Sequence, residues 1–390
     1  MSLRGTKRVR MVWKLFRSIR SRGFRHCKLK SLNKTMLTKE NVSVTVIVPC
    51  RNEIRRIRDF LDSAIQQDTA GIDLEIVVAD GMSGDGTREI LEEYEREFPA
   101  LRVIDNPQGI VSTGLNAAIR QARGEIIVRM DAHTEYASDY IRTCVQVLKE
   151  TNAENVGGPA LTRAEGYVAQ AIASGFHSKF VSGGARFHDA LYEGSVDTVT
   201  YGCWSKSTLF RVGLFDEQLY RSQDDELNVR IRAAGGKIWQ SPRITSWYWP
   251  RATLDALFRQ YFQYGFWKVA VIRKHRRPAS WRNLAPPASL LLGVFLLLGA
   301  LCAWLSGSGW WESEFLRIFV SLAALYSVIS LGAAFTVGRR GGWRYIPVLP
   351  LVFATYQLSY GLGFLLALTF RPVTWDRPSC LRKILTAITR

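Results

Sequence analysis

The sequence predicts a doubly wound α/β domain followed by transmembrane helices. Strand patterns alternate with helical patterns between residues 42 and 250, and three apolar stretches follow, each long enough to cross a bilayer as a helix. We therefore divide the 390-residue chain into five segments: 1–41 (basic), 42–250 (α/β domain), 251–283 (amphipathic, interfacial), 284–370 (transmembrane) and 371–390 (basic tail).

The α/β domain opens on a β-branched run, residues 44–48, which is typical of a buried parallel strand. Apolar residues spaced three and four apart in residues 57–65 predict the helix that follows. The alternation continues with a strand at 74–79, a helix at 88–98, a strand at 101–104, a helix at 112–122 and a strand at 125–129. Ligands of such a sheet bind at the carboxyl ends of its strands, so we expect Pro49, Asp80 and Asp131 around one crevice.

Two metal-capable residues, Asp131 and His133, follow the last of these strands. Residues i and i+2 of an extended chain point the same way, so we predict that the two side chains share a divalent cation. Such an ion neutralises the adjacent phosphates of a nucleotide diphosphate. An imidazole ligand makes the site softer than two carboxylates would, which favours Mn over Mg.

Four motifs in register resemble those of the family 2 inverting glycosyltransferases. They are Val46-Ile47-Val48-Pro49-x-x-Asn52-Glu53, Asp80-x-x-Ser83-x-Asp85-Gly86-Thr87, Gly109…Asn116…Gly124-Glu125 and Asp131-x-His133. The resemblance runs from about residue 42 to about residue 249 and is nearest to the bacterial succinoglycan-type exopolysaccharide glucosyltransferases. It implies a nucleotide-diphospho-sugar transferase domain of the GT-A type, a UDP-sugar donor and a divalent metal, Mn or Mg.

The resemblance also implies roles for single residues. It assigns the nucleotide-sugar site to Pro49, Glu53, Asp80, Gly109, Asn116 and Asp131. Asp80 would accept a hydrogen bond from the uracil N3–H, and Asp131 would bind the metal with His133 as second ligand or through water. The chain departs from the commoner pattern at Gly81, where many relatives have a second aspartate, and at His133, which replaces the second acid.

The general base of an inverting transfer is expected in the segment Gln223-Asp224-Asp225-Glu226-Leu227, which resembles the family's Glu-Asp-x-Asp/Glu-Leu. In that register the base is Asp224, and Asp225 is the alternative. Acids in a first helical turn also stabilise the helix dipole, whatever their chemical role.

The sugar or acceptor pocket is expected to be walled by Tyr201, Gly202 and Trp204, because aromatic faces stack on sugars. Trp204 is equally compatible with an ordinary position in the core.

Three transmembrane spans are predicted, at 284–305, 315–337 and 345–370. Basic clusters at 273–282 and 339–344 flank the first two spans, whereas the loop 306–314 has no Lys or Arg, so the positive-inside rule places the α/β domain in the cytoplasm. Three spans would put the basic tail outside. Pro347 and Pro350 raise an alternative in which the third stretch is broken or re-entrant and the tail returns to the cytoplasm.

The regions that flank the predicted spans are basic or aromatic. The N-terminal segment carries most of the net charge of +18 but lacks the apolar core of a signal peptide, so it is either a membrane-surface segment or a solvated tail. A nucleic-acid partner is disfavoured, because the positive charge is confined to this segment and to the membrane flanks. Residues 258–267 predict an aromatic interfacial helix.

The expected function is that of a multi-pass enzyme of the cytoplasmic (inner) membrane. It would transfer a single hexose, glucose by the resemblance, from a UDP-sugar to a lipid-linked (polyprenyl diphosphate) saccharide, in company with other polysaccharide-assembly proteins. Three alternatives remain: a processive polysaccharide synthase, a polyprenyl-phosphate glycosyltransferase and an inactive membrane scaffold. The processive synthase is disfavoured because no clear Gln-x-x-Arg-Trp follows the expected base.

Overall fold

The computed structural model describes residues 41–276, 278 and 280–369. The predictions for residues 1–40 of the basic N-terminal segment and for the tail 371–390 lie outside the described residues. The central sheet has eight strands in the order β3-β2-β1-β4-β9-β6-β10-β8. They are β1 (Val42–Cys50), β2 (Ile72–Asp80), β3 (Leu101–Asp105), β4 (Ile126–Arg129), β6 (Asn155–Gly158), β8 (Gly194–Ser195), β9 (Thr200–Ser205) and β10 (Ile238–Gln240).

The first four strands confirm the predicted doubly wound pattern. β1 pairs in parallel with β2 on one side and with β4 on the other, and β2 pairs in parallel with β3. The chain thus reverses its direction of travel across the sheet at β1, and such a switch point is where ligands bind. β9 breaks the parallel pattern, since it runs antiparallel to both β4 and β6.

Helices cover both faces of this sheet, and alternate residues of each strand feed the two cores. Val46 and Val48 pack with α2 (Ile57–Ile65), α3 (Thr87–Glu97) and α5 (Tyr140–Thr151), whereas Ile47 packs on the opposite face. That second core includes α4 (Val111–Gln121), α8 (Lys206–Val212) and α9 (Gln223–Ala233). A small sheet, β5 (Glu135–Tyr136), β11 (Ser246–Tyr248) and β7 (Leu161–Thr162), and the helices α6 (Tyr167–Phe176) and α7 (Lys179–Ser182) complete this part. Short 3-10 turns lie at Arg186–His188, Trp281–Leu284 and Trp343–Tyr345.

Four long helices follow the α/β domain. They are α10 (Leu254–His275), α11 (Ala285–Leu305), α12 (Gly309–Gly341) and α13 (Leu349–Thr369). The last three are long and apolar enough to cross a membrane. Helix α12 begins earlier than expected, so Glu312 and Glu314 lie in its first turns and not in a loop. The prolines do not break α13, since Pro350 lies in its first turn, where a missing backbone N–H costs no hydrogen bond.

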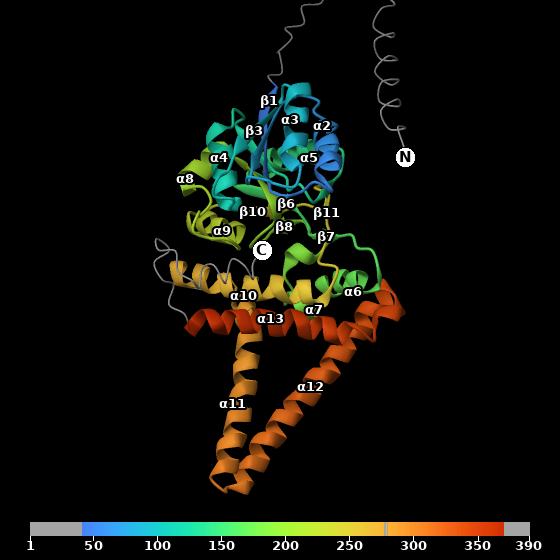
Figure 1. Cartoon of the computed structure of the whole chain (residues 1–390), viewed down its shortest axis with the longest axis vertical. Coiled ribbons are helices and arrows are strands. Elements are labelled where there is room, and N and C mark those ends of the chain that lie inside the picture. Colours follow the sequence, from blue (N-terminus) through green and yellow to red (C-terminus); the bar gives the residue numbers. More distant parts are fainter. Residues whose placement is uncertain (1–40, 277, 279, 370–390) are drawn as a thin grey trace, which may run out of the picture. The chain divides into compact units, whose positions relative to one another are not determined.

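Helix α13 packs against α10 along most of its length (Figure 1). A Cβ added at Gly265 would lie 2.0 Å from the Tyr360 carbonyl oxygen, and one added at Gly363 would lie 2.0 Å from the Phe262 carbonyl oxygen. The two backbones therefore touch without an intervening side chain. In the most apolar part of α13 44% of the residues are buried, against 17% for α11 and 11% for α12. Hydropathy alone does not reveal this difference.

Candidate active site

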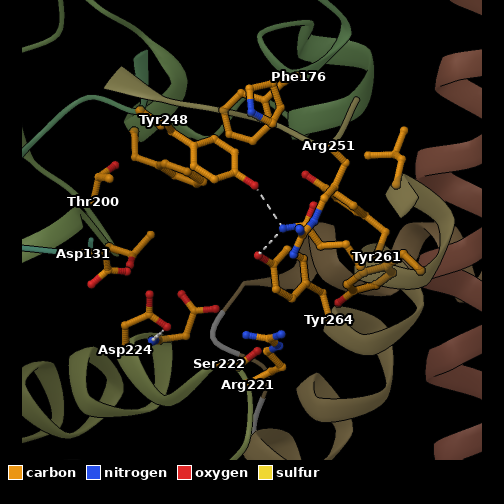
Figure 2. A pocket seen from close by; sticks show the side chains of 18 of the residues that line it. Asp131, Phe176, Thr200, Arg221, Ser222, Asp224, Tyr248, Arg251, Tyr261 and Tyr264 are labelled. Atoms are coloured by element: carbon orange, nitrogen blue, oxygen red, sulfur yellow. Dashed lines mark hydrogen bonds between the residues drawn. The ribbon is translucent and has the colours of Figure 1, made fainter. Parts of the chain in front are cut away.

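A cavity of about 1730 Å³ lies at the carboxyl ends of β1 and β4 and continues beneath α9 toward α10 and α13. Figure 2 shows carboxylates on one of its walls, from Asp131 and Asp224, and aromatic rings of Tyr248, Tyr261 and Tyr264 on another. Of the residues predicted for the site, those that line the cavity are Pro49, Glu53, Gly109, Asp131, His133, Tyr201, Asp224 and Asp225. The fold thus brings most of the candidates predicted from the sequence into one cavity.

The segment around Gly109 approaches the first strand closely. Its φ of 62° favours glycine, and an added Cβ would lie 2.3 Å from Arg51 Nη1, so the arginine would have to move. The Arg51 guanidinium donates to the Gly109 carbonyl oxygen over 3.3 Å. This contact fixes the loop after β3 against the loop after β1, across the switch point.

Asp80, the expected uracil acceptor, lies just behind the cavity wall, and its neighbour Gly81 lines the cavity. The Asp80 carboxylate is buried and accepts hydrogen bonds from the Ser83 hydroxyl at 2.6 Å and the Ser83 backbone N–H at 3.3 Å. Arg88 lies 3.4 Å from it. In this structure Asp80 organises the 80–87 loop, and its contact with a base stays a prediction.

Asp131 does not lie on an extended strand, so the geometry predicted for the Asp-x-His pair is wrong. β4 ends at Arg129, and the Thr134 N–H donates to the Asp131 carbonyl oxygen at 3.1 Å, which closes a turn over 131–134. The Asp131 N–H is held by the Tyr136 hydroxyl oxygen at 2.7 Å. The buried Arg129 guanidinium binds both Asp131 carboxylate oxygens, at 2.8 and 2.9 Å. This bidentate pair fixes the carboxylate toward the cavity.

His133 completes the turn and faces Glu53, with 3.3 Å between His133 Nδ1 and Glu53 Oε1. Burial lowers the pKa of His133, but the hydrogen bond to Glu53 and the negative charges of Asp131 and Glu53 outweigh it, so the net shift is upward. Within residues 41–369, leaving out the masked 277 and 279, no group of three or more His, Cys, Asp or Glu side chains could hold a metal by itself. The residues fit a site at which the protein supplies one or two ligands and the substrate phosphates supply others, as is usual for Mg²⁺ with nucleotides.

Asp224 and Asp225 begin α9 and have different environments. Asp225 forms an ion pair with Lys268 of α10, with 2.5 Å between Nζ and Oδ2. Asp224 makes no ion pair with any other described residue, and the contact of its carboxylate is with the Asp225 N–H at 3.1 Å. Burial and then the charge of Asp225 raise the pKa of Asp224, although Arg129 opposes the shift. An unpaired carboxylate with a raised pKa suits a general base.

The predicted pocket wall is only partly realised. Tyr201 lines the cavity and its hydroxyl lies 2.5 Å from the Thr134 hydroxyl. Trp204 does not line the cavity, because it is 1% exposed and packs in the core, with 6.0 Å between the centroids of its ring and the Phe215 ring. Gly202 does not line the cavity either. It has a φ of 110°, and an added Cβ would lie 2.3 Å from the Trp204 ring. Gly202 is therefore required by the packing of Trp204.

Asn116, expected beneath the ribose and diphosphate, does not reach the cavity lining. It is 1% exposed, its side-chain amide donates to the Phe215 carbonyl oxygen and to Glu217 Oε1, both at 2.8 Å, and its carbonyl oxygen accepts from the Phe215 N–H at 2.9 Å. The structure thus gives Asn116 the task of holding the turn that precedes α9.

Sequence reasoning missed several lining residues that the fold brings together. Gln260 of α10 donates to the hydroxyl oxygens of Tyr248 at 3.0 Å and of Tyr264 at 3.1 Å, which joins the small sheet to α10 (Figure 2). Arg129 and Arg251 line the same cavity. The aromatic character of 258–267 was a signal for Gln260 and Tyr264, but it indicated the membrane surface and not a substrate cavity.

Comparison with known proteins agrees with the geometry. The family profile described as "Glycosyl transferase family 2" matches residues 45–219 and so ends before Asp224. "Succinoglycan biosynthesis protein ExoA" of Rhizobium meliloti (strain 1021) is 30% identical over 328 residues, which cover 83% of this chain and 94% of that protein. A Methanococcus voltae protein, "Dolichyl N-acetyl-alpha-D-glucosaminyl phosphate 3-beta-D-2,3-diacetamido-2,3-dideoxy-beta-D-glucuronosyltransferase", is 27% identical over 239 residues, covering 59% of this chain and 74% of its own.

Among solved structures, the mannosyltransferase PcManGT of Pyrobaculum calidifontis, in complex with GDP-Man and Mn²⁺, superposes with a TM-score of 0.50. It is 20% identical, and the alignment covers 81% of this chain and 86% of that one. At this identity the likeness concerns the fold. The chain belongs to glycosyltransferase family 2, and its α/β domain is of the GT-A type. It is a membrane-associated glycosyltransferase related to an exopolysaccharide biosynthesis protein.

Proposed function

We propose that this enzyme transfers a single hexose from a UDP-sugar, with inversion, to a lipid-linked saccharide at the cytoplasmic face of the inner membrane. The observation that carries the proposal is the difference between the two acids at the start of α9. Asp225 is neutralised by Lys268, whereas Asp224 faces the cavity without a cationic partner among the described residues.

The Asp224 carboxylate acts as general base and takes the proton from the acceptor hydroxyl as that oxygen attacks the anomeric carbon. Its raised pKa makes it a stronger base than an ordinary aspartate. Inversion follows from a single displacement, because the oxygen enters from the face opposite the leaving diphosphate. Asp225 cannot take this part while Lys268 holds it.

The donor lies across the cavity from Asp224, between Pro49 and Gly109. Asp131 and His133 would hold a divalent metal, Mn or Mg, which would neutralise the charge of the donor phosphates there. Arg129 fixes the Asp131 carboxylate in place before the donor binds. Preorganised charge of this kind is a large term in transfer reactions that expel a charged leaving group.

The proposal of a lipid-linked acceptor is supported by the elements that line the cavity. Its lining passes from the α/β domain to residues of α10, α11, α12 and α13, which include the three apolar helices of the chain. An acceptor held in the membrane reaches Asp224 through this end of the cavity. The exopolysaccharide relative described above supports a role in polysaccharide assembly.

The membrane arrangement that we propose has two spans, α11 and α12, with α13 lying in the membrane surface beside α10. The Arg344 guanidinium, just before α13, donates to Gln170 of α6 at 2.8 Å, and Arg273 of α10 donates to the Leu368 carbonyl oxygen at 3.1 Å near the end of α13. Both ends of α13 thus contact elements that lie on the side of the α/β domain. A helix of 21 residues is about 32 Å long, so a crossing α13 would carry one of these ends to the other membrane face.

The experiment that tests this function measures UDP release by the detergent-solubilised full chain, with Mn²⁺, over a panel of UDP-sugars and with a membrane lipid extract as acceptor. One donor should give release, and both Asp131→Ala and Asp224→Asn should abolish it. Asp255→Asn is the matched control, because Asp255 also begins a helix but is exposed and lies outside the cavity. Release that survives in Asp224→Asn at the wild-type rate would overturn the assignment of the base.

A further inference from the structure

The lining of the cavity extends from the carboxylates to residues of the apolar helices, and we call that end the lipid arm. The residues that define this lipid arm are Phe180 of α7, Ser289 of α11, Tyr326 of α12 and Gln357 of α13. Ser289 and Tyr326 are also exposed, so the arm reaches the outer surface of the α11–α12 hairpin. That surface faces lipid when the hairpin crosses a bilayer. A continuous path therefore joins lipid to Asp224.

The α11–α12 hairpin is open at the end that lies toward α10 and α13. At the far end α11 and α12 are in contact, where the rings of Phe295 and Phe315 lie 6.2 Å apart and an added Cβ at Gly299 would lie 2.8 Å from Phe315. Toward α10 and α13 the two helices diverge (Figure 1).

Different partners hold the diverging ends. An added Cβ at Gly361 of α13 would lie 3.0 Å from the Pro286 carbonyl oxygen of α11, whereas one at Gly341 of α12 would lie 3.2 Å from Ser174 of α6. Since each helix is fixed to a different neighbour, the opening between them is part of the fold.

We propose that the lipid arm binds the isoprenoid chain of a polyprenyl diphosphate acceptor, which enters sideways between α11 and α12. The inference rests on the proposed function and deepens it, since it assigns the place of the acceptor lipid. Tyr326 and Phe180 form the aromatic wall of the arm, with ring centroids 5.6 Å apart. Aromatic faces suit a flat, unsaturated chain. The Gln357 side-chain amide donates to the Phe180 carbonyl oxygen at 2.9 Å, so this polar group already has a hydrogen-bond partner in the arm.

The head group is recognised by cations that line the cavity between the arm and the carboxylates. Arg282 lies directly before α11, where its stem packs over Gly183 and its guanidinium binds Asp197. Arg251 lines the cavity on the side of Tyr261 (Figure 2) and forms no ion pair with another residue of the described ranges. A diphosphate offers two charged groups to two arginines, whereas a phospholipid offers one phosphate. The arginine guanidinium binds phosphate through charge-assisted, bidentate hydrogen bonds.

Site-specific photocrosslinking tests the lipid arm without requiring turnover. The full chain carries p-benzoylphenylalanine in place of Tyr326, or in place of Leu325 as the matched control, in phosphatidylcholine nanodiscs doped with polyprenyl diphosphate. Leu325 is the next residue of α12, and it is exposed without lining the cavity. We expect polyprenyl adducts to be several-fold more abundant at position 326 than at 325, where phosphatidylcholine adducts should dominate.

A plug in the arm provides the second measurement. Ser289→Trp should remove the enrichment at position 326, whereas Ser327→Trp, an exposed serine of α12 outside the cavity lining, should preserve it. Thermal unfolding of both variants shows whether either has lost the fold. Equal adduct yields at 325 and 326, phospholipid adducts alone at 326, or an enrichment unaffected by Ser289→Trp would each overturn the proposal. Failure of UDP release with selective crosslinking would instead count against the proposed reaction.

Discussion

The Lys268 ammonium lies 2.5 Å from Asp225 Oδ2, one residue along α9 from the proposed base, Asp224. Lys268 is buried in α10, so a helix outside the α/β domain supplies the counter-charge to the catalytic helix. Without this ammonium, the Asp225 carboxylate would act on Asp224 uncompensated. The pair therefore sets the electrostatic field in which Asp224 works.

We expect Lys268→Met to lower the rate of transfer by about tenfold on the acid limb of the pH–rate profile, which is what one unit of added pKa at Asp224 would cause there. The rate falls as the base is protonated, so the acid limb of the pH–rate profile should move to higher pH and the variant should approach wild-type activity in alkaline buffer. Measuring kcat against pH checks this.

The double variant Lys268→Met/Asp225→Asn should recover the wild-type limb, because it removes both charges of the pair. Lys274→Met is the control, since Lys274 lies on α10 like Lys268, pairs with Asp216 and with Glu226 of α9, and does not line the cavity. A uniform loss of activity with an unmoved acid limb would show that Lys268 is only structural.

Asp224→Asn should make the inactive protein more stable at neutral pH. Burial and the Asp225 charge raise the pKa of Asp224 in the folded protein, so the folded state binds this proton more tightly than the unfolded state does. Between the two pKa values the stability therefore falls as the pH rises, and the ionised group is a net cost at pH 7. Thermal unfolding should show a higher Tm for Asp224→Asn at pH 7 and a shrinking difference as the pH falls through the raised pKa. A lower Tm at every pH would contradict the shift.

Asn116→Ala should destabilise the protein by about 2 kcal/mol and leave nucleotide binding intact, because the variant strands the backbone groups of Phe215 that Asn116 satisfies. Thermal unfolding and the KM for the donor separate the two effects. A raised KM with unchanged stability would restore the role that the resemblance implied for Asn116.

A reporter fused after Arg390 should lie on the same side of the membrane as the α/β domain if α13 lies in the membrane surface. We expect a C-terminal fluorescent protein that matures only in the cytoplasm to fluoresce, and alkaline phosphatase at the same place to be inactive. Fusion of either reporter after Ser308, between α11 and α12, should give the reverse pattern. The opposite result at Arg390 would mean three spans.

Sequence reasoning worked where the physical signal was local and repeated. The parallel strands were visible because each is buried on both faces, and their carboxyl ends were predicted to meet. The acids of α9 were visible as a motif, although only the fold shows that Asp225 is paired and Asp224 is not. The ion pair between Asp225 and Lys268 cannot be predicted from the pattern of residues 222–230, because Lys268 lies on another helix.

The failures have physical causes of the same kind. Asp131 and His133 were expected to follow β4 on an extended chain, but a turn over 131–134 follows Arg129, and the Arg129 guanidinium and the Tyr136 hydroxyl bind Asp131 there. Trp204 could not be placed because Tyr201 and Gly202 have positive φ values and break the alternation of faces in β9. Hydropathy predicted a membrane span for α13 as it did for α11, because transfer scales do not include the backbone contact of α13 with α10.

The ion pairs between α9 and α10 change where this enzyme can be shortened. A chain that ended at residue 250 would look like a complete α/β domain, but it would lose Lys268, Lys274 and His275. Glu226, which has no exposed side-chain surface, would then be left with Arg230 alone, and Asp225 would have no cation. A shortened version of the enzyme must therefore keep α10 through His275, because cutting before it would unbalance the catalytic helix.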